Sequence, residues 1–308
     1  MPSRHRLAIS FSGGETSAYM THRLMSDPQV RAECDVVIQF ANTGQENEKT
    51  LTFVERCAQH FGWPVVMVEA QPRARGVGHR VVTFETASRN GEPFEAVIRK
   101  FGIPNSKFRH CTRSLKQHPM QSYLRSIGWK AGSYDTAIGI RADEFDRCSA
   151  TAKQQRLIYP LATRWPMTKP EINAFWMQKP FRLGLKGYEG NCQWCWKKSF
   201  RKHMTLLTEK PDIYDFPERM ERENSTVGPE FKKERREGYK RQFFRGNRTV
   251  ADLRDMTTAA LLDGTFSAAK DDAEWTDPLL DQAAGGCGEQ CDVFGDERPF
   301  DALAGDEE

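Results

Sequence analysis

The sequence has no long apolar run. Nothing in its 308 residues approaches the roughly 20 consecutive apolar residues that a membrane-spanning helix needs. The first residues, MPSRHRLAISF, also lack the apolar core followed by small residues that marks a secretory leader. Internal repeats and low-complexity tracts are absent. We therefore expect a cytoplasmic protein with no membrane partner.

A disulfide framework is not expected either, because the cytosol keeps thiols reduced. The eight cysteines therefore need another explanation. Three stand alone in the sequence and are interpreted as buried packing residues: Cys34, Cys57 and Cys148. Five lie among Gly, His, Trp and charged residues, a poor setting for core packing: Cys111, Cys192, Cys195, Cys287 and Cys291.

Charge is unevenly distributed along the chain. The formal net charge is +3, but residues 270–308 contain thirteen acidic residues against two basic ones, so the rest of the chain carries +14. A basic body of this kind suits an anionic ligand such as a nucleotide, and it is also compatible with nucleic acid.

The N-terminal part alternates between strand and helix patterns. Strands are predicted over residues 6–11, 35–41 and 64–68, and helices over 15–25 and 46–61, with glycine turns between them. This βαβαβ order predicts an α/β protein with a doubly wound, mostly parallel, Rossmann-like sheet.

The middle of the chain is less regular. Residues 70–110 are rich in Arg, Gly and Pro, and they are predicted to form an irregular, ligand-covering loop. A helix over 112–127, strands over 136–140 and 157–161, and a helix over 170–177 are predicted to follow.

The pattern changes near residue 205. The sequence therefore predicts a nucleotide-binding α/β domain over 1–205 and a helical extension with an acidic, Cys-containing tail over 206–308. Residues 231–248 combine eight Lys or Arg with interleaved Phe and Tyr. They could bind nucleic acid, but we expect a solvated helix paired with the acidic tail. His203 is expected at the surface.

Residues 10–17 (SFSGGETS) form the sharpest local motif. Glycines permit a tight turn with exposed N–H groups, and the helix that follows directs its positive end at the same place. The hydroxyls of Ser12, Thr16 and Ser17 add further donors. The motif predicts a phosphate or pyrophosphate site, and an ordinary glycine turn is the alternative.

Cys192 and Cys195 form a CxxC pair within the segment GNCQWCWKK. This spacing lets two thiolates bind one metal centre. A redox dithiol is the rival interpretation, but that motif normally begins a helix of a thioredoxin-like unit, and no such pattern surrounds this pair. Lys197 and Lys198 favour the thiolate form in either role.

These motifs occur in the order of a known family. SGGETS at 12–17 resembles the SGGxDS pyrophosphate loop of the adenine nucleotide α-hydrolase superfamily, which includes ATP pyrophosphatases, tRNA-thiolating enzymes and sulfonucleotide reductases. NTGQE at 42–46, followed by Thr50, is similar to the DTGxExxxT segment of the phosphoadenosine phosphosulfate (PAPS) reductase branch. GIRADE at 139–144 and YPL at 159–161 are similar to its GxRxxES and xPL segments.

The resemblance implies an adenine nucleotide as ligand, either ATP or a sulfonucleotide such as PAPS or its 3′-dephospho form, APS. It places the nucleotide against eight residues: Ser12, Gly13, Gly14, Thr16, Ser17, Thr43, Gly44 and Arg141. Arg141 would act as a catalytic anion ligand. Because Thr16 stands where ATP-cleaving members have Asp, any Mg²⁺ would depend on Asp143 or Glu144.

The resemblance also implies an iron–sulfur centre. In cluster-carrying reductases of this branch, a Cys-Cys pair before a helix joins a distant CxxC to hold a 4Fe–4S cluster, and His110-Cys111 occupies the position of that pair. The implied ligands are Cys111, Cys192 and Cys195, with Cys291, Cys287, His110 or an open iron position as the fourth. Zinc suits the same donors and stays open as the alternative.

The C-terminal tail contains GGCGEQC at 285–291. It resembles the mobile tail that carries a nucleophilic Cys in sulfonucleotide reductases, which makes Cys287 the candidate nucleophile. The same thiol would serve equally as a cluster ligand. Such chemistry needs a thiol reductant or a sulfur-donor protein as partner.

The sequence thus predicts an enzyme of sulfonucleotide reduction or of ATP-dependent sulfur transfer. The alternative is a nucleic-acid-binding or DNA-modification partner protein, with a vestigial nucleotide site and a structural metal centre. Thr16 in place of Asp and the basic residues 231–248 favour that alternative.

Overall fold

The computed structural model describes residues 4–228 and 239–271. Its centre is a six-stranded sheet in the order β4-β3-β2-β1-β5-β6. The strands are β1 (His5–Ser10), β2 (Cys34–Asn42), β3 (Val65–Pro72), β4 (Val77–Val82), β5 (Asp135–Ile138) and β6 (Leu157–Ile158). All neighbours pair in parallel except β3 and β4, which are antiparallel. The chain is an α/β protein with a mostly parallel sheet, consistent with a Rossmann-like fold.

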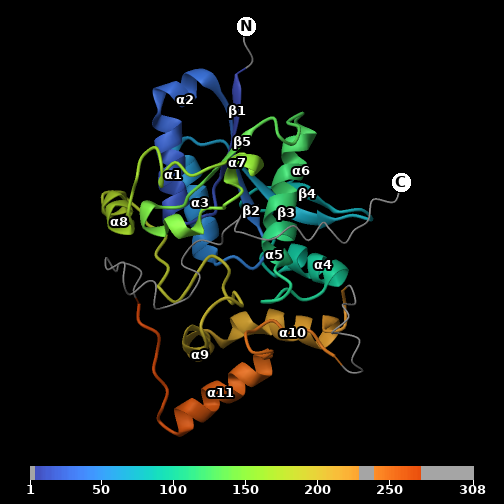
Figure 1. Cartoon of the computed structure of the whole chain (residues 1–308). Coiled ribbons are helices and arrows are strands. Elements are labelled where there is room, and N and C mark those ends of the chain that lie inside the picture. The colour runs from blue at the N-terminus through green and yellow to red at the C-terminus, as the bar shows by residue number, and fades with distance from the viewer. Residues whose placement is uncertain (1–3, 229–238, 272–308) are drawn as a thin grey trace.

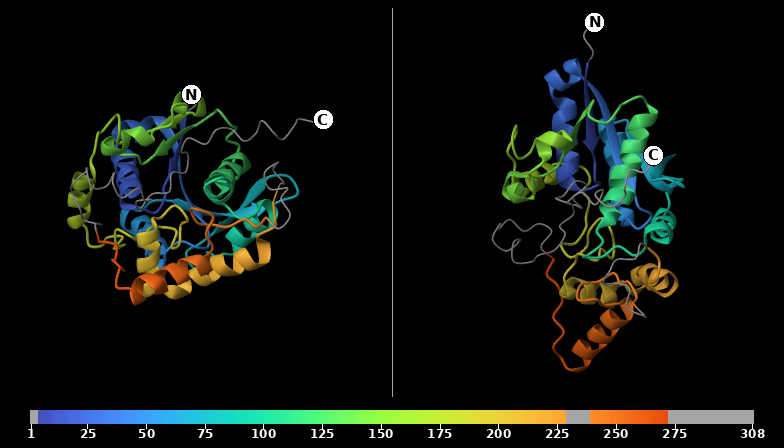
Figure 2. Two further views of the ribbon diagram at one scale, coloured as in Figure 1. Left: turned by 60° about the horizontal axis from the view of Figure 1, so that its bottom comes forward. Right: turned by 45° about the vertical axis from the view of Figure 1, so that its right-hand side comes forward.

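Both faces of the sheet are covered (Figures 1 and 2). Successive residues of a strand point to opposite faces, and in β1 they enter different core clusters. Leu7 and Ile9 pack in the cluster that includes residues of α1 (Glu15–Ser26) and α3 (Glu48–Phe61). Ala8 packs with Leu124 of α6 (His118–Ser126) on the other face. This alternation explains why apolar residues run along the strand without a polar face.

Further helices complete these layers. They are α2 (Pro28–Glu33), α4 (Glu92–Phe101), α5 (His110–Thr112), the π-helical turn η1 (Arg113–Gln117), the 3-10 turn η2 (Ala142–Arg147), α7 (Ala152–Gln155) and α8 (Lys169–Met177). The last part contains α9 (Phe200–Glu209), the 3-10 turn η3 (Pro211–Tyr214), α10 (Asp215–Asn224) and α11 (Val250–Leu262). None of the helices within the described ranges is long and apolar enough to cross a membrane.

The last helices lie below the sheet in Figure 1 and share a second core cluster with it. That cluster joins Phe94 and Leu115 to Trp194, Phe243 and Leu253. The helix α9 runs through residue 205, and the cluster draws on residues from both sides of that position. The boundary near residue 205 stays a prediction.

The interpretation of residues 70–110 as an irregular loop is wrong. The segment contains β4 and α4, which are joined by residues 83–91. This antiparallel edge strand has the sequence VGHRVV, and its glycine, His and Arg interrupt the apolar pattern that would predict a strand. Pro93 looks like a breaker, but proline is favoured in the first turn of a helix, and here it begins α4.

The predicted solvated helix within residues 231–248 is also wrong where it falls in the described ranges. Residues 239–248 are not helical. Phe243 and Phe244 are buried in the second core cluster, and Arg241 is buried with its guanidinium over the ring of Phe108. These aromatic side chains are therefore packing residues. His203 is likewise 1% exposed instead of lying at the surface.

Candidate functional site

The predicted phosphate turn lies where the strand order of the sheet reverses. The chain leaves β1 toward β2 on one side, while β5 pairs with β1 on the other, with Ser10 opposite Ile138. Residues 11–14 and 139–144 follow these two adjacent parallel strands, so both segments lie at the same edge. Open α/β sheets bind ligands in the crevice at such a switch point.

Glycine is required at two positions of this edge. Gly13 has φ +83°, and a Cβ there would lie 2.6 Å from Cγ2 of Thr50. Gly139 lets the strand end approach the next helix, because a Cβ there would lie 2.9 Å from Cα of Ser17. The tight turn and the close approach of α1 therefore both depend on missing side chains.

The N-terminus of α1 carries no side-chain cap. Gly14 is the N-cap residue, and the first N–H groups of a helix have no partner within the helix. The hydroxyl of Ser17 instead fixes the turn itself, since it accepts from the N–H of Ser12 at 3.1 Å and from the Ser12 hydroxyl at 2.9 Å. It donates to the carbonyl of Gly14 at 2.9 Å. The loop is thus held in one conformation with its helix dipole directed outward.

Arg141 joins the two segments. Its Nη1 lies 3.4 Å from the hydroxyl of Thr16, and its side chain is buried. The guanidinium is paired with Asp143 at 2.9 Å and with Glu144 at 3.3 Å. The predicted anion ligand therefore reaches the phosphate turn with its charge already balanced, and both candidate Mg²⁺ ligands are bound to it.

A second buried ion pair anchors the start of α1. The carboxylate of Glu15 accepts from Nε of Arg182 at 3.1 Å, from its Nη2 at 3.0 Å, and from the N–H of Leu183 at 3.1 Å. The indole of Trp176 donates to the Glu15 carbonyl at 2.9 Å. These contacts fix the first turn of α1 from the side opposite Arg141's loop.

The predicted Thr43-Gly44 turn lies at the end of β2, next to β1. The N–H of Gly44 donates to Oδ1 of Asn42 at 3.1 Å, and the hydroxyl of Thr43 donates to Glu46 at 3.1 Å. Glu46 also forms an ion pair at 3.3 Å with Lys116 of η1. Both charged side chains are buried, at 0% and 8% exposed, so this pair ties the turn to the helix that follows Cys111.

The CxxC segment packs directly against these turns. Cys192 forms an antiparallel bridge with Glu46, and the N–H of Asn47 donates to the carbonyl of Asn191 at 2.6 Å. The amide of Asn191 donates to the carbonyl of Ser12 at 2.8 Å. The structure therefore brings Cys192 beside the phosphate turn, although 179 residues separate Asn191 from Ser12.

Cys195 and Cys111 border the second core cluster. Cys195 is buried between Trp194 and Trp196, which belong to that cluster, and Cys111 packs against it. The Trp194 ring stacks on Phe94 with centroids 5.3 Å apart. Two of the three predicted thiol ligands that the structure describes, Cys111 and Cys195, thus border the same core cluster.

Lys198 is a buried cation beside the CxxC pair. It is 1% exposed, and its Nζ donates to the carbonyl of Tyr188 at 3.4 Å. A Cβ on Gly190 would lie 3.0 Å from this Nζ and 3.9 Å from the Cys192 carbonyl, so the charge is close to the segment. A buried ammonium with one carbonyl partner favours an anion such as a thiolate nearby.

His110 and Cys111 begin the helical segment that leads into α6. Burial lowers the pKa of His110 to about 4, so its imidazole is neutral. Nε2 lies 3.1 Å from the carbonyl of Gly102, and Nδ1 is buried without a hydrogen-bond partner. A neutral ring with a vacant nitrogen suits metal ligation.

The donors do not form a ready metal site. Within residues 4–228 and 239–271, no three His, Cys, Asp or Glu side chains are grouped so that they could hold a metal ion. Cys287 and Cys291, the other predicted ligands, lie outside the described residues.

Several residues of this site carry no recognisable signal in the sequence. Asn191, Glu15, Arg182 and Lys116 were not predicted, because each acts through a partner far away along the chain. Lys198 was noted only for its charge.

A scan against models of known protein families finds no match. The fold and the geometry at the switch point define an α/β protein with converging turns at one edge of its sheet. The chain is 30% identical over 303 residues to the uncharacterised nin region protein ORF290 of Escherichia phage lambda, which covers 95% of this chain and 97% of that protein. The chain belongs to the family of this phage protein.

A second relative is the uncharacterised protein MJ0066 of Methanocaldococcus jannaschii. It is 25% identical over 116 residues, which is 38% of this chain. The matched part spans only 19% of that protein.

Proposed function

We propose that this protein is an enzyme of the PAPS reductase-like branch of the adenine nucleotide α-hydrolase superfamily. It binds ATP or a sulfonucleotide with the phosphates at residues 12–17, and it reduces the sulfonucleotide or uses ATP to transfer sulfur. The observation that carries the proposal is the contact between Arg141 and Thr16, which joins the turn after β1 to the segment after β5 at the switch point.

The charge arrangement supports phosphate binding. The uncapped N-terminus of α1 offers N–H donors and a positive dipole end. Arg141 is held in place by Asp143 and Glu144, so its fork is oriented before a ligand arrives. A phosphate at the turn would share this guanidinium with the two carboxylates, and Thr43 and Gly44 would line the neighbouring strand end.

Sulfur chemistry is supported by the position of the CxxC segment. Asn191 attaches this segment to the phosphate turn, and Lys198 places a buried positive charge close to the segment. In the proposal Cys287 is the nucleophile, and a thiol reductant or a sulfur-donor protein supplies the electrons or the sulfur. A 4Fe–4S cluster on Cys111, Cys192, Cys195 and Cys291 would supply charge stabilisation, and zinc is the alternative occupant.

Two activity assays test the proposal on the purified full-length chain. Pyrophosphate release from ATP indicates sulfur transfer by adenylylation, and sulfite formation from PAPS indicates reduction. The Arg141→Lys variant should lose most of either activity, because Lys lacks the planar fork that Asp143 aligns. Absence of both activities, together with no change in thermal stability on adding ATP or PAPS, would contradict the proposal.

The metal centre has its own test. Anaerobic purification followed by an absorption spectrum and iron analysis should show a cluster that is lost in Cys111→Ala and in Cys195→Ala. Cys34→Ala is the matched control, since Cys34 lies at the opposite end of β2 and should keep the iron. If the purified protein is colourless and contains stoichiometric zinc, the site holds zinc and not an iron–sulfur cluster.

The nucleic-acid partner protein remains the competing function. Salt-sensitive nucleic-acid binding with neither enzymatic activity would support it over the enzyme.

A further inference from the structure

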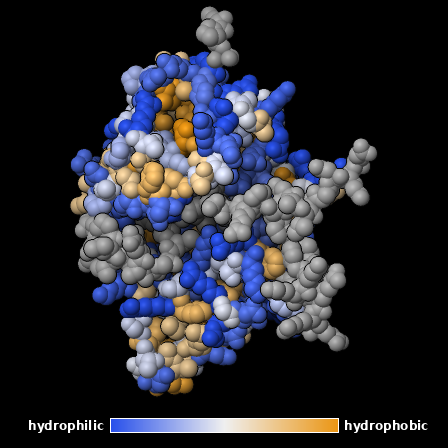
Figure 3. Space-filling model, viewed as in Figure 1, coloured by the Kyte–Doolittle hydropathy of each residue, from blue (hydrophilic) through white to orange (hydrophobic). Residues whose placement is uncertain are grey.

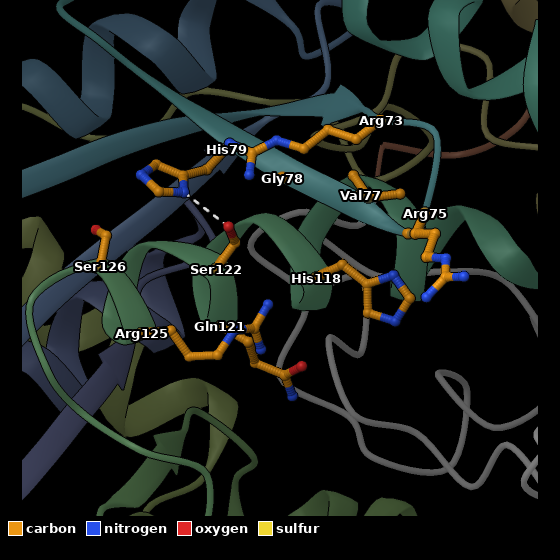
Figure 4. Close-up of a pocket in the computed structure, with 11 residues that line it drawn as sticks. Arg73, Arg75, Val77, Gly78, His79, His118, Gln121, Ser122, Arg125 and Ser126 are labelled. Carbon is orange, nitrogen blue, oxygen red and sulfur yellow. Dashed lines mark hydrogen bonds between the residues drawn. The ribbon is translucent and has the colours of Figure 1, made fainter. Parts of the chain in front are cut away.

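A hollow of about 590 Å³ lies away from the phosphate turn, between the β3–β4 hairpin and α6 (Figure 4). We call it the basic groove and define it by six of its lining residues: Arg73, Arg75, His79, His118, Ser122 and Arg125. Among the described residues that line it, none is acidic and none is Phe, Tyr or Trp. The part of the surface that carries α6 is also predominantly hydrophilic (Figure 3).

No carboxylate among residues 4–228 and 239–271 balances the charge of the three arginines in the basic groove. Arg73, Arg75 and Arg125 are exposed, and none of them forms an ion pair with the residues that the structure describes. Arg80 of β4 differs, because it pairs with Glu69 of β3. Three adjacent positive charges create a positive local potential, which attracts an anionic ligand.

The groove is built on a fixed backbone. Lys100 donates to the carbonyls of Ala74 at 3.2 Å and of Gly76 at 3.0 Å, which holds the hairpin turn. The guanidinium of Arg73 lies over Gly78, where a Cβ would be 2.5 Å from Cζ. On the opposite wall, the hydroxyl of Ser122 is 2.8 Å from Nδ1 of His79, as Figure 4 shows. The walls therefore hold their shape without a ligand.

The local electrostatic potential agrees with this. The pKa of His79 is lowered, first by partial burial and then by the positive charges of Arg73 and Arg125. The two arginines thus act on the same space from opposite walls of the groove.

We infer that the basic groove binds the phosphate backbone of a nucleic-acid strand. The lining residues of α6 at 118, 121, 122 and 125 lie on one helix face and extend over about 10 Å. A strand of B-form DNA carries one phosphate per about 3.4 Å of axis, so the groove spans about three phosphates. That length suits a polyphosphodiester chain better than a single phosphate group. Arginine side chains are frequent phosphate ligands, so we expect the groove to contact the backbone.

This inference does not depend on the chemistry at the phosphate turn. The groove lies at the β4 edge of the sheet, and the turn lies between β1 and β5. A protein without any nucleotide activity could still bind nucleic acid here, and the reverse also holds.

The test is fluorescence anisotropy of a labelled single-stranded oligonucleotide with the full-length protein at several salt concentrations. The double variant Arg73→Gln/Arg125→Gln should weaken binding about tenfold or more. It should also reduce the slope of log K against log salt by about 1.4, because each phosphate contact on a single strand contributes about 0.7. Lys153→Gln is the control, because this exposed residue lies in α7 beside the opposite edge strand, β6.

A second variant changes the position of the Arg73 side chain but keeps its charge. Gly78→Ala should displace Arg73 from its place over the backbone and weaken binding, while the net charge is unchanged. Equal affinities for the wild type, the double variant and Lys153→Gln would overturn the inference.

Pyrophosphate tests whether the basic groove binds a small free phosphate compound instead of a nucleic-acid backbone. If it binds to the wild type but not to the double variant, and the oligonucleotide binds equally to both, the groove is a site for small phosphates and the inference is wrong. If the oligonucleotide binds through the groove and equimolar pyrophosphate does not displace it, the nucleic-acid assignment stands.

Discussion

The phosphate turn and the basic groove use arginine in opposite ways. Arg141 at the turn is 6% exposed and is paired with Asp143 and Glu144. Arg73 and Arg125 of the groove are exposed and have no ion pair within the described residues. A buried, aligned fork favours one geometry of one ligand, whereas exposed cations attract any polyanion and are screened by salt.

The difference indicates two kinds of binding in one chain. At the turn, neighbouring groups have already balanced the charge, so selectivity depends on shape and on hydrogen bonds. At the groove, the positive charge of the arginines would be balanced by the ligand, so the affinity for that ligand depends on ionic strength. Variants that alter charge balance at one region should therefore leave the other unchanged.

The largest effect is expected where a buried charge loses its partner. Glu46→Gln removes the carboxylate of a buried ion pair with Lys116, which is 8% exposed, and the free energy of unfolding should fall by about 3–5 kcal/mol. Glu48→Gln is the matched control two residues away. Its exposed pair with Arg89 should contribute less than about 1 kcal/mol. Urea titration measures both, and equal losses would show that burial does not set the strength of these pairs.

Gly13→Ala should act on the backbone of the turn. It places a side chain at φ +83° and 2.6 Å from Thr50, so we expect a loss of about 2–3 kcal/mol and no stabilisation by ATP or PAPS. Gly62→Ala separates strain from crowding, because Gly62 has φ +66° but nothing within 4 Å of its Cβ position. It should lose only about 1 kcal/mol and keep the ligand response.

Acidic pH should lower the free energy of unfolding because His203 is buried. Burial lowers its pKa to about 3, with Lys198 and Arg245 adding to the effect. Below about pH 6.5 the unfolded chain takes up a proton that the folded chain refuses, so stability falls as the pH drops. Between pH 7 and pH 5 this residue should account for about 2 kcal/mol of that loss.

His203→Gln should remove this part of the pH dependence. Unfolding by urea at the two pH values measures it, with His60→Gln on the exposed side of α3 as the control. An unchanged difference between the two pH values in His203→Gln would show that this imidazole is not the group responsible.

The smallest effect directly compares the two regions. Arg141→Lys should weaken ATP or PAPS binding about tenfold, or 1.4 kcal/mol, because the bidentate contact to Asp143 no longer aligns the cation. Its oligonucleotide affinity should equal that of the wild type, since the basic groove is untouched. Calorimetry with the nucleotide and anisotropy with the oligonucleotide provide the two readouts. A parallel loss in both would show that the regions form one site.

The sequence predicts the parallel part of the sheet well. The strands β1, β2 and β3 and the helices between them follow from apolar runs of the right length separated by glycine turns. The convergence of residues 12–17 with Arg141 follows as well, because the carboxyl ends of neighbouring parallel strands meet at one edge.

The edge of the sheet and the cross-links of the site could not be predicted in this way. The strand β4 has no alternation of apolar and polar residues that would predict a strand. It forms because it pairs with β3, and the sequence does not show this pairing. Contacts such as Glu15 with Arg182 join positions 167 residues apart, and no local pattern encodes them. No local pattern predicts that Arg73 and Arg125 form no ion pair within the described residues either, since this depends on which acids the fold brings near.

The amide of Asn191 links the turn after β1 to α3, since it donates to the carbonyl of Ser12 while its own oxygen accepts from the hydroxyl of Thr50 at 3.3 Å. A displacement of the CxxC segment would therefore break the hydrogen bonds of Asn191 to Ser12 and Thr50. Occupancy of the turn after β1 by a ligand should slow the alkylation of Cys192, so a maleimide reagent would report nucleotide arrival at a sulfur atom that never touches it.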